Sequence, residues 1–191
     1  MNILRKISVF LLTLVLASGM VLTELPLGSS FTSTALAANS PDKGPVTPTT
    51  QVGVEITGKN TVAITSISSK EKKVTIPATI SSNGETYIVS KIKKGSIKEK
   101  YDQVTLILDT STEVDKTICV TKKAKKTKKI VIKANDNKKK LKARQFNKTG
   151  FKGFKGKIIV KKSAMTKKEF KKLVKKLRKG GFKGKIVRKN G

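Results

Sequence analysis

Lysine is the residue type in this chain whose number and position most favour a chemical role. Residues 116–191 contain 31 Lys or Arg but only two acidic residues, Asp136 and Glu169, which gives a net charge of +29. Residues 38–115 contain ten Lys and nine acidic residues, a net charge of +1. A strong positive field attracts polyanions. The pattern therefore predicts an anionic partner, with solubility or loose surface retention as the alternative role of the charge.

The basic side chains are densest in Lys167–Lys179, where eight of them accompany a single acidic residue, Glu169. The chain has only four Arg residues, so lysine supplies nearly all of the positive charge. Base-specific contacts to nucleic acid favour Arg, whereas attraction to phosphate needs no base sequence. We therefore expect no specific nucleic-acid partner. The candidate polyanion-binding residues are Lys167, Lys168, Lys171, Lys172, Lys175, Lys176, Arg178 and Lys179.

The residue types that carry most enzyme chemistry are missing or isolated. The chain has no His, the commonest general base and metal ligand. Its one cysteine, Cys119, is flanked by aliphatic residues and is expected in the core, since a single Cys makes neither a zinc site nor an intramolecular disulfide. We predict a protein that is not an enzyme and has no cofactor or metal. The acidic residues nearest to one another match no calcium-loop spacing; they are Asp102, Asp109, Glu113 and Asp115.

Residues 1–37 have the pattern of a secretory signal peptide. Arg5 and Lys6 form a basic start, Ile7–Leu16 is apolar, and Ala35–Ala37 is a small-residue cleavage site. An uncleaved membrane anchor is the alternative, although the apolar stretch is short for a membrane span. We expect cleavage near Ala37, a secreted or cell-surface-associated protein, and no integral membrane span after cleavage.

A Pro- and Thr-rich linker is predicted over residues 38–51, followed by one domain over residues 52–191. Two β-hairpins are expected in its first part, residues 52–92, where apolar and polar residues alternate. The second hairpin would pair Val74–Ile80 with Thr86–Ile92 across an Asn-Gly turn. Pro77 lacks a ladder donor, which predicts an edge strand or a repeat boundary there.

Short apolar segments then recur at intervals of 26–30 residues, and the hexapeptide Gly-Phe-Lys-Gly-Lys-Ile occurs at both Gly153–Ile158 and Gly181–Ile186. Such a period is typical of stacked repeats, in which each unit buries its apolar face against its neighbours. We interpret the glycines of this hexapeptide as turn residues. The strand residues expected in the core are Val74, Ile76, Val104, Leu106, Ile130, Ile132, Ile158, Val160 and Ile186.

The spacer before the last strand predicts an α-helix over Lys167–Lys179. Thr166 and Glu169 have the spacing of a capping box, and Gly180 is expected in the left-handed conformation after the helix. Lys138–Asn147 is predicted as a shorter, weaker equivalent. Several phenylalanines lie among these lysines. They could be stacking platforms for a ligand, but their helical and turn spacings favour packing in the core, which we expect. The apolar stripe expected to be buried contains Phe170, Leu173, Val174 and Leu177.

Two segments resemble the BspA-like branch of bacterial leucine-rich-repeat surface proteins. Val74–Ile80, the Asn83-Gly84 turn and Tyr87–Ile92 are similar to the family pattern V-T-I-P-x-x-V, N-G, Y-x-V-x-x-I. Ile158–Val187 is similar to its closing unit of strand, Lys-rich helix, Gly turn and strand. The chain departs from the family where Ser96-Ile97 and Gln145-Phe146 replace the usual Ala-Phe, and it has few repeats.

The resemblance covers roughly residues 52–191 and implies a short, degenerate member of this family. The implied fold class is an α/β leucine-rich-repeat-like solenoid: β-hairpins over 52–92, degenerate repeats with short stacked parallel strands over 93–157, and a lysine-rich helix-plus-strand cap over 158–191. The resemblance implies a secreted or surface-displayed scaffold, in some members involved in adhesion, and supplies no catalytic residues.

The leading functional hypothesis is a secreted, non-catalytic adhesion or binding scaffold at the cell surface. Its lysine-rich half would attract an anionic cell-wall polymer or an acidic glycan, and a protein on a host or neighbouring cell is a further candidate partner. Two alternatives remain open. One is membrane action by a cationic amphipathic segment, and the other is non-specific nucleic-acid binding.

Overall fold

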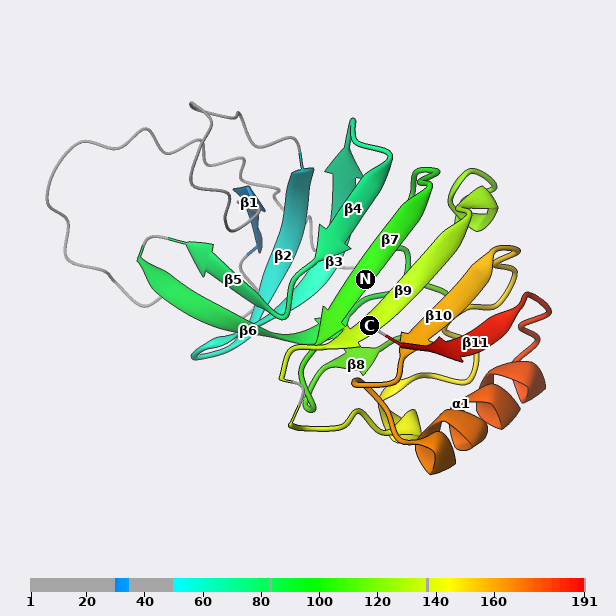
Figure 1. Ribbon diagram of the computed structural model, residues 1–191. Helices are drawn as coiled ribbons and strands as arrows, with labels where there is room; N and C mark the ends of the chain where they lie inside the picture. Colours follow the sequence, from blue (N-terminus) through cyan, green and yellow to red (C-terminus); the bar gives the residue numbers. More distant parts are fainter. Residues whose placement is uncertain (1–29, 35–49, 83, 137, 191) are drawn as a thin grey trace, which may run out of the picture.

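The computed structural model describes residues 30–34, 50–82, 84–136 and 138–190, which form two β-sheets and one α-helix (Figure 1). The helix α1 spans Lys167–Lys179, and two 3₁₀ turns span Ala124–Lys126 (η1) and Ala143–Gln145 (η2). Sheet A contains β1 (Ser30–Thr34), β2 (Thr50–Gly58), β3 (Thr61–Ser69), β5 (Thr79–Ser82), β6 (Glu85–Ile92) and β8 (Glu113–Val114). Sheet B contains β4 (Lys73–Ile76), β7 (Gln103–Leu108), β9 (Lys129–Ala134), β10 (Lys157–Lys161) and β11 (Ile186–Lys189).

Sheet B is parallel throughout, with the strand order β11-β10-β9-β7-β4. Its register pairs Val74 with Val104, Val104 with Ile130, Ile130 with Ile158, and Ile158 with Ile186. Because successive residues of a strand point to opposite faces, this register lines up one apolar residue from each strand on the same face. The recurring apolar segments of the sequence are thus the strands of sheet B.

Sheet A is mixed. β1 pairs with β2, β2 with β3, and β5 with β6, all antiparallel, whereas β6 runs parallel to both β3 and β8. Outside the named strands, isolated parallel bridges align Ile67 with Ile97 and Ile97 with Cys119. From β4 to β10 the chain therefore returns to a sheet A strand or an isolated bridge between successive sheet B strands, and only the β10–β11 connection forms α1 instead in the described residues.

The predicted α/β leucine-rich-repeat-like solenoid is therefore wrong, because the structure is mostly β, with 44% strand and 14% helix, and sheet A is mixed. An α/β fold covers parallel strands with helices in the connections. In the part of the chain that the structure describes, only the β10–β11 connection contains an α-helix. The weaker helix predicted at Lys138–Asn147 is reduced to η2. Its buried residues Leu141 and Phe146 are five positions apart, which does not place them on one helical stripe.

The predicted second hairpin is also partly wrong. Val74–Ile80 does not form one strand, because β4 ends at Ile76 and β5 begins at Thr79, on the other side of Pro77. β4 joins sheet B beside β7, whereas β5 pairs with β6 in sheet A. Pro77 cannot donate to a ladder, and it lies where the chain passes from one sheet to the other.

A single apolar cluster extends from Val52 in β2 to Phe182 beyond α1, and it stabilises the domain by removing apolar surface from water. The one cysteine, Cys119, is a free thiol within this cluster. Of the nine strand residues that the sequence predicts in the core, eight are buried in sheet B and the ninth, Ile186, is partly buried. The eight are Val74, Ile76, Val104, Leu106, Ile130, Ile132, Ile158 and Val160.

The two copies of the repeated hexapeptide lie against each other. The rings of Phe154 and Phe182 stack with their centroids 6.2 Å apart and their planes at 13°. A Cβ on Gly184 would lie 2.4 Å from the carbonyl oxygen of Gly156, so glycine is required for this approach of the two backbones. The hexapeptide therefore specifies a contact between the turns that enter β10 and β11.

The end of α1 differs in one detail from the prediction. Gly180 has φ −83° rather than the expected left-handed conformation, and Gly181 adopts the positive φ of 87°. Glycine is needed at position 180 for a different reason, because a Cβ there would lie 1.7 Å from the carbonyl oxygen of Lys148. Gly180 is therefore needed for the close contact between two backbone segments, and Gly181 for the turn with positive φ after the helix.

β1 lies within the segment predicted to be a signal peptide. Ser30–Thr34 pairs with Gln51–Glu55 of β2, whereas the rest of residues 1–37 lies outside the described residues. Most of the predicted linker, residues 38–49, lies outside them as well, and β2 begins at Thr50. The signal peptide and the linker therefore stay predictions, and cleavage after Ala37 would separate β1 from β2.

Candidate polyanion-binding surfaces

The eight basic residues predicted to bind polyanions lie on α1, around the side of the helix that faces away from the core. Seven are exposed and Lys176 is half-buried. We call this set the helix cluster: Lys167, Lys168, Lys171, Lys172, Lys175, Lys176, Arg178 and Lys179.

Three members of the helix cluster are engaged within the protein. Lys172 forms an ion pair with Glu169 (Nζ to Oε1, 2.8 Å), and Lys176 Nζ donates to the carbonyl oxygen of Ala143 at 3.3 Å. Arg178 donates to a main-chain carbonyl at 2.9 Å, and its guanidinium lies 5.4 Å from a phenylalanine ring centroid. In the described part of the chain, five members have no such contact: Lys167, Lys168, Lys171, Lys175 and Lys179.

Leucines hold the opposite side of α1 against the core. Leu173 and Leu177 are fully buried, and Phe170 is partly buried against the same cluster. Val174, expected in the buried stripe, is only half-buried, because it lies one position around the helix from the line that joins the two leucines. The apolar side of α1 is therefore narrower than predicted and is already covered by the protein.

The predicted capping box forms only in part. Thr166 Oγ1 accepts a hydrogen bond from the Glu169 amide at 3.2 Å, but the Glu169 carboxylate accepts from the Ala143 amide at 2.8 Å instead of returning to the cap. The hydrogen bond from Lys172, followed by the one from Ala143, lowers the pKa of Glu169 below its ordinary value. This carboxylate therefore ties α1 to η2.

A second basic surface, which the sequence analysis missed, lies on the outer face of sheet B. In β9, Ile130 and Ile132 are buried, so Lys129, Val131 and Lys133 point to the other side of the sheet. The same alternation applies in β10 and β11. We call this surface the lysine face; its basic residues are Lys129, Lys133, Lys157, Lys161 and Lys189.

Register places the lysine-face side chains in two rows that cross the strands. Lys129 pairs with Lys157 in one row, and Lys161 pairs with Lys189 in the other. Lys133 follows Ile132, which is the partner of Val160, so it extends the second row. Neighbouring strands are about 4.8 Å apart, so at that spacing the first row carries one lysine on each of β9 and β10, and the second row one on each of β9, β10 and β11.

An apolar stripe separates the two lysine rows. Val131 pairs with Ile159, and Ile159 pairs with Val187, on the outer side of the sheet. Val131 is 6% exposed, whereas the other two are half-buried. Thr105 of β7, paired with Val131, continues the stripe. No acidic residue occupies an outward position of β9, β10 or β11, and none of the ion pairs among the described residues includes a lysine of this face.

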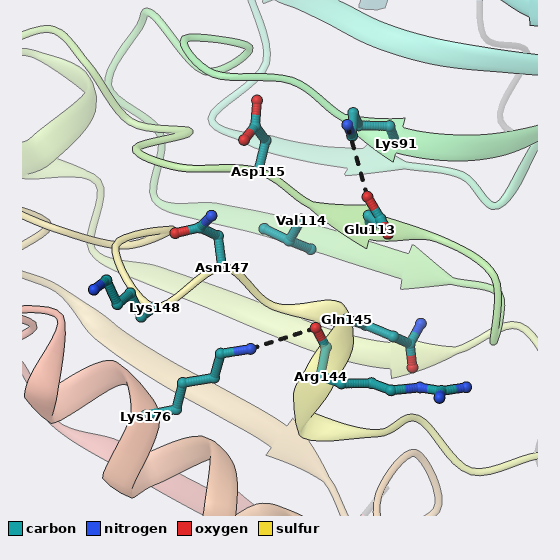
Figure 2. Close-up of a pocket in the computed structure, with 9 residues that line it drawn as sticks. All are labelled: Lys91, Glu113, Val114, Asp115, Arg144, Gln145, Asn147, Lys148 and Lys176. Carbon is teal, nitrogen blue, oxygen red and sulfur yellow. Dashed lines mark hydrogen bonds and ion pairs between the residues drawn. The ribbon is translucent and has the colours of Figure 1, made fainter.

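A cavity of about 480 Å³ lies between α1, η2 and the β6–β8 pair (Figure 2). Its charged lining includes Lys91, which forms an ion pair with Glu113 at 3.6 Å, and Lys176, whose ammonium group contacts main-chain carbonyls. Gln145 in its wall donates to two carbonyl oxygens, at 2.9 and 2.8 Å. Much of the polar lining is thus used for internal contacts. The remaining lining residues are Val114, Asp115, Arg144, Asn147 and Lys148.

The other candidate groups of the sequence analysis are separated or inert in the structure. Cys119 is buried, and burial raises the pKa of its thiol to about 12, which disfavours the nucleophilic thiolate. Asp102 pairs with Lys128 at 3.0 Å, and that hydrogen bond lowers the pKa of its carboxyl. Among the described residues, no three His, Cys, Asp or Glu side chains are grouped to hold a metal ion.

Asp109 is held by its own turn. Partial burial alone would raise the pKa of its carboxyl, but hydrogen bonds from the Ser111 amide and hydroxyl outweigh burial and lower it. The phenylalanines considered as stacking platforms pack inward, apart from the partly buried Phe170. The four buried rings are Phe146, Phe151, Phe154 and Phe182.

Comparisons with protein-family models, curated proteins and solved structures give no match to this chain. The resemblance to BspA-like proteins therefore stays a prediction from the motifs in residues 74–92 and 158–187. Within the described residues, no helix has the length and apolar character needed to cross a membrane.

Proposed function

We propose that this protein is a secreted, non-catalytic binding module that attaches to anionic polymers at the cell surface through its lysine-rich half. The observation that carries the proposal is the charge asymmetry of the chain, +29 in residues 116–191 against +1 in residues 38–115. Clustered lysines bind polyanions by releasing the counterions around them. The partner class is an anionic cell-wall polymer or an acidic glycan, and adhesion to a neighbouring surface is a consequence of that attachment.

Internal pairing leaves most of this charge available. Among the described residues, five ion pairs form, and only the Lys172–Glu169 pair lies wholly within residues 116–190. The helix cluster and the lysine face lie on different sides of the core. The apolar side of α1 and the inner face of sheet B pack in the same apolar cluster, and the lysines of each point away from it. The lysine-rich half therefore presents cations on more than one side.

Membrane action by α1 is the weaker candidate. A cationic helix binds a bilayer by burying its apolar side in the headgroup region. In α1 the residues that would do so, Leu173 and Leu177, are fully buried in the core. Dye leakage from anionic vesicles on addition of the intact protein would favour this alternative over the binding module.

The test of the proposed function is binding of the purified protein to immobilised anionic wall polymer at salt concentrations from 50 to 500 mM. We expect strong binding at low salt and a steep, log-linear fall as salt rises, because screening and counterion release both weaken the attraction. A neutral polysaccharide is the control ligand. Absence of binding at 50 mM salt, or binding that does not change with salt, would contradict the proposal.

A further inference from the structure

The two lysine rows of the lysine face place like charges directly beside one another. Lys129 and Lys157 are register partners, and so are Lys161 and Lys189. Like charges on opposed strand positions destabilise a sheet. Within the described structure, no carboxylate pairs with these side chains; Lys161 contacts only the carbonyl oxygen of Asn190, at 3.2 Å. An external polyanion would supply the missing counter-charge.

The repulsion is confined to one part of sheet B. The residue of β7 that pairs with Lys129 is Gln103, and the residue that pairs with Lys133 is Ile107. These two rungs are therefore neutral at β7, which separates the lysines of β9–β11 from Lys73, the partner of Gln103 on β4. The lysine face therefore ends at β7, and its two rows run across the strands from β9 to β11.

We propose that the lysine face binds a linear acidic polysaccharide, which lies across β9, β10 and β11 with its carboxylates on the two lysine rows and its ring faces on the half-buried Ile159 and Val187 of the stripe. This inference rests on the proposed function and names the polymer class and the surface. The rows are four residues apart along each strand, a separation of about 13 Å, and long, flexible lysine side chains reach inward from both sides.

The apolar stripe selects this polymer class over a polyphosphate. A polyphosphate carries its charge along its central backbone, which would lie directly over Val131 and Ile159. Burying charge against apolar side chains without a partner is unfavourable. A polyuronate instead carries its carboxylates at the edges of sugar rings whose C–H faces are weakly polar. Its charge pattern therefore matches a surface with cations at both sides and an apolar centre.

The test compares two variants that each remove five charges. The face variant is K129Q, K133Q, K157Q, K161Q and K189Q, and the matched helix variant is K167Q, K168Q, K171Q, K175Q and K179Q. The ligand is polygalacturonate, with polyphosphate and dextran in parallel, and binding is measured from 50 to 300 mM salt. Thermal unfolding verifies that both variants fold.

We expect the face variant to lose about 100-fold or more in polygalacturonate affinity at 50 mM salt, and to lower the salt slope by about 3.5, at roughly 0.7 for each of the five lost contacts. The helix variant should lose less than about 10-fold, with a slope change below about 1. A third variant, Ile159→Thr, should weaken polygalacturonate binding several-fold with an unchanged salt slope, because it alters the stripe and leaves the charge intact.

Three outcomes would overturn the inference and leave the proposed function standing: equal losses in the face and helix variants, stronger binding of polyphosphate than of polygalacturonate, or no effect of Ile159→Thr. Absence of binding to either polyanion by the unmodified protein would instead contradict the proposed function itself. The two failures are therefore distinguishable in one set of measurements.

Discussion

The two halves of this domain handle their charged residues in opposite ways. Residues 50–115 contain nearly equal numbers of cations and anions, and pairs such as Lys93–Glu55, at 2.6 Å, join β2 to the end of β6. Residues 116–190 share the same core but contain only two acids. Two of their lysines, Lys123 and Lys128, pair with acids of the first half, Glu99 and Asp102.

The second half is therefore held together by burial and close backbone contact rather than by ion pairs. Exposed ion pairs contribute only about 0–1 kcal/mol each, so their scarcity costs the fold little. The surplus lysines are then unexplained by folding, which is why we assign them a role in binding. Substitutions that perturb one half and spare the other test whether the two halves differ in this way.

The largest effect is expected from a charge in the core beneath α1. Leu173→Asp places an unpaired carboxylate at a fully buried position and should lower the free energy of unfolding by about 4 kcal/mol. Amide exchange of Ile158–Val160 in β10 should accelerate, because α1 packs on the same cluster. Val174→Asp, at the half-buried neighbouring position, should cost about 1 kcal/mol. Unchanged protection in β10 would show that α1 does not stabilise the sheet.

A smaller effect is expected from adding one methyl group where two backbones meet. Gly180→Ala would place a Cβ 1.7 Å from the Lys148 carbonyl oxygen and should cost about 3 kcal/mol in chemical denaturation, because the turn must move. Gly84→Ala is the matched change in the first half. Gly84, unlike Gly180, has a positive φ, but no atom lies within 4 Å of the added Cβ, so its cost should be only about 1 kcal/mol. Equal costs would argue against close backbone contact as the special feature of the second half.

The smallest effect is expected at Glu169, the one acid of the second half with an ion pair. Its folded-state pKa is lowered, so it contributes stability above its unfolded pKa, and that stability is lost as the pH falls through the folded value. Glu169→Gln should cost about 1 kcal/mol at pH 7 and should reduce the loss of stability between pH 5 and pH 3. Urea unfolding across this range is the measurement.

Other carboxylates also contribute to the loss of stability at low pH. Asp102 and Asp109 also have lowered pKa values and keep their share of the pH dependence in the variant. Lys172→Gln is the control that removes the ion pair but leaves the bond from the Glu169 carboxylate to the Ala143 amide. If Glu169→Gln lost stability between pH 5 and pH 3 as steeply as the unmodified protein, the Glu169 carboxylate would not be the group that ties α1 to η2.

Local sequence signals predicted the elements of this protein well. The helix has the predicted bounds Lys167–Lys179, because a cap residue, a leucine pair and a terminal glycine act within a few residues of one another. The strand segments were also visible, since 28-residue spacings place Ile130, Ile158 and Ile186 in register. These features depend on residues close in sequence or on exact repetition.

The arrangement of the elements could not be predicted in the same way. β6 reads as the second strand of a hairpin, but its additional parallel pairing with β3 and β8 depends on contacts between distant segments. Val74–Ile80 reads as one strand, and only tertiary structure shows that the chain changes sheet at Pro77.

The lysine face was missed although its signal is local. Lys129–Lys133 and Lys157–Lys161 share the pattern K-I-x-[IV]-K, which places both lysines and the middle residue on one side of a strand. These lysines enter the sequence-based prediction only through the net charge of residues 116–191. Dividing each strand into its two faces would have separated them from the helix cluster.

The two open edges of sheet B bear on assembly. Among the described residues, β4 and β11 each pair with one strand, so both are edges along which a second copy could add its own strand. Each edge strand carries a lysine, Lys73 on β4 and Lys189 on β11. Lysines on edge strands oppose edge-to-edge pairing of sheets. A bound polymer that neutralises the last strand would remove this protection. The same charge that recruits the polymer therefore keeps the free molecules apart, and its neutralisation would allow neighbouring molecules on one chain to join their sheets.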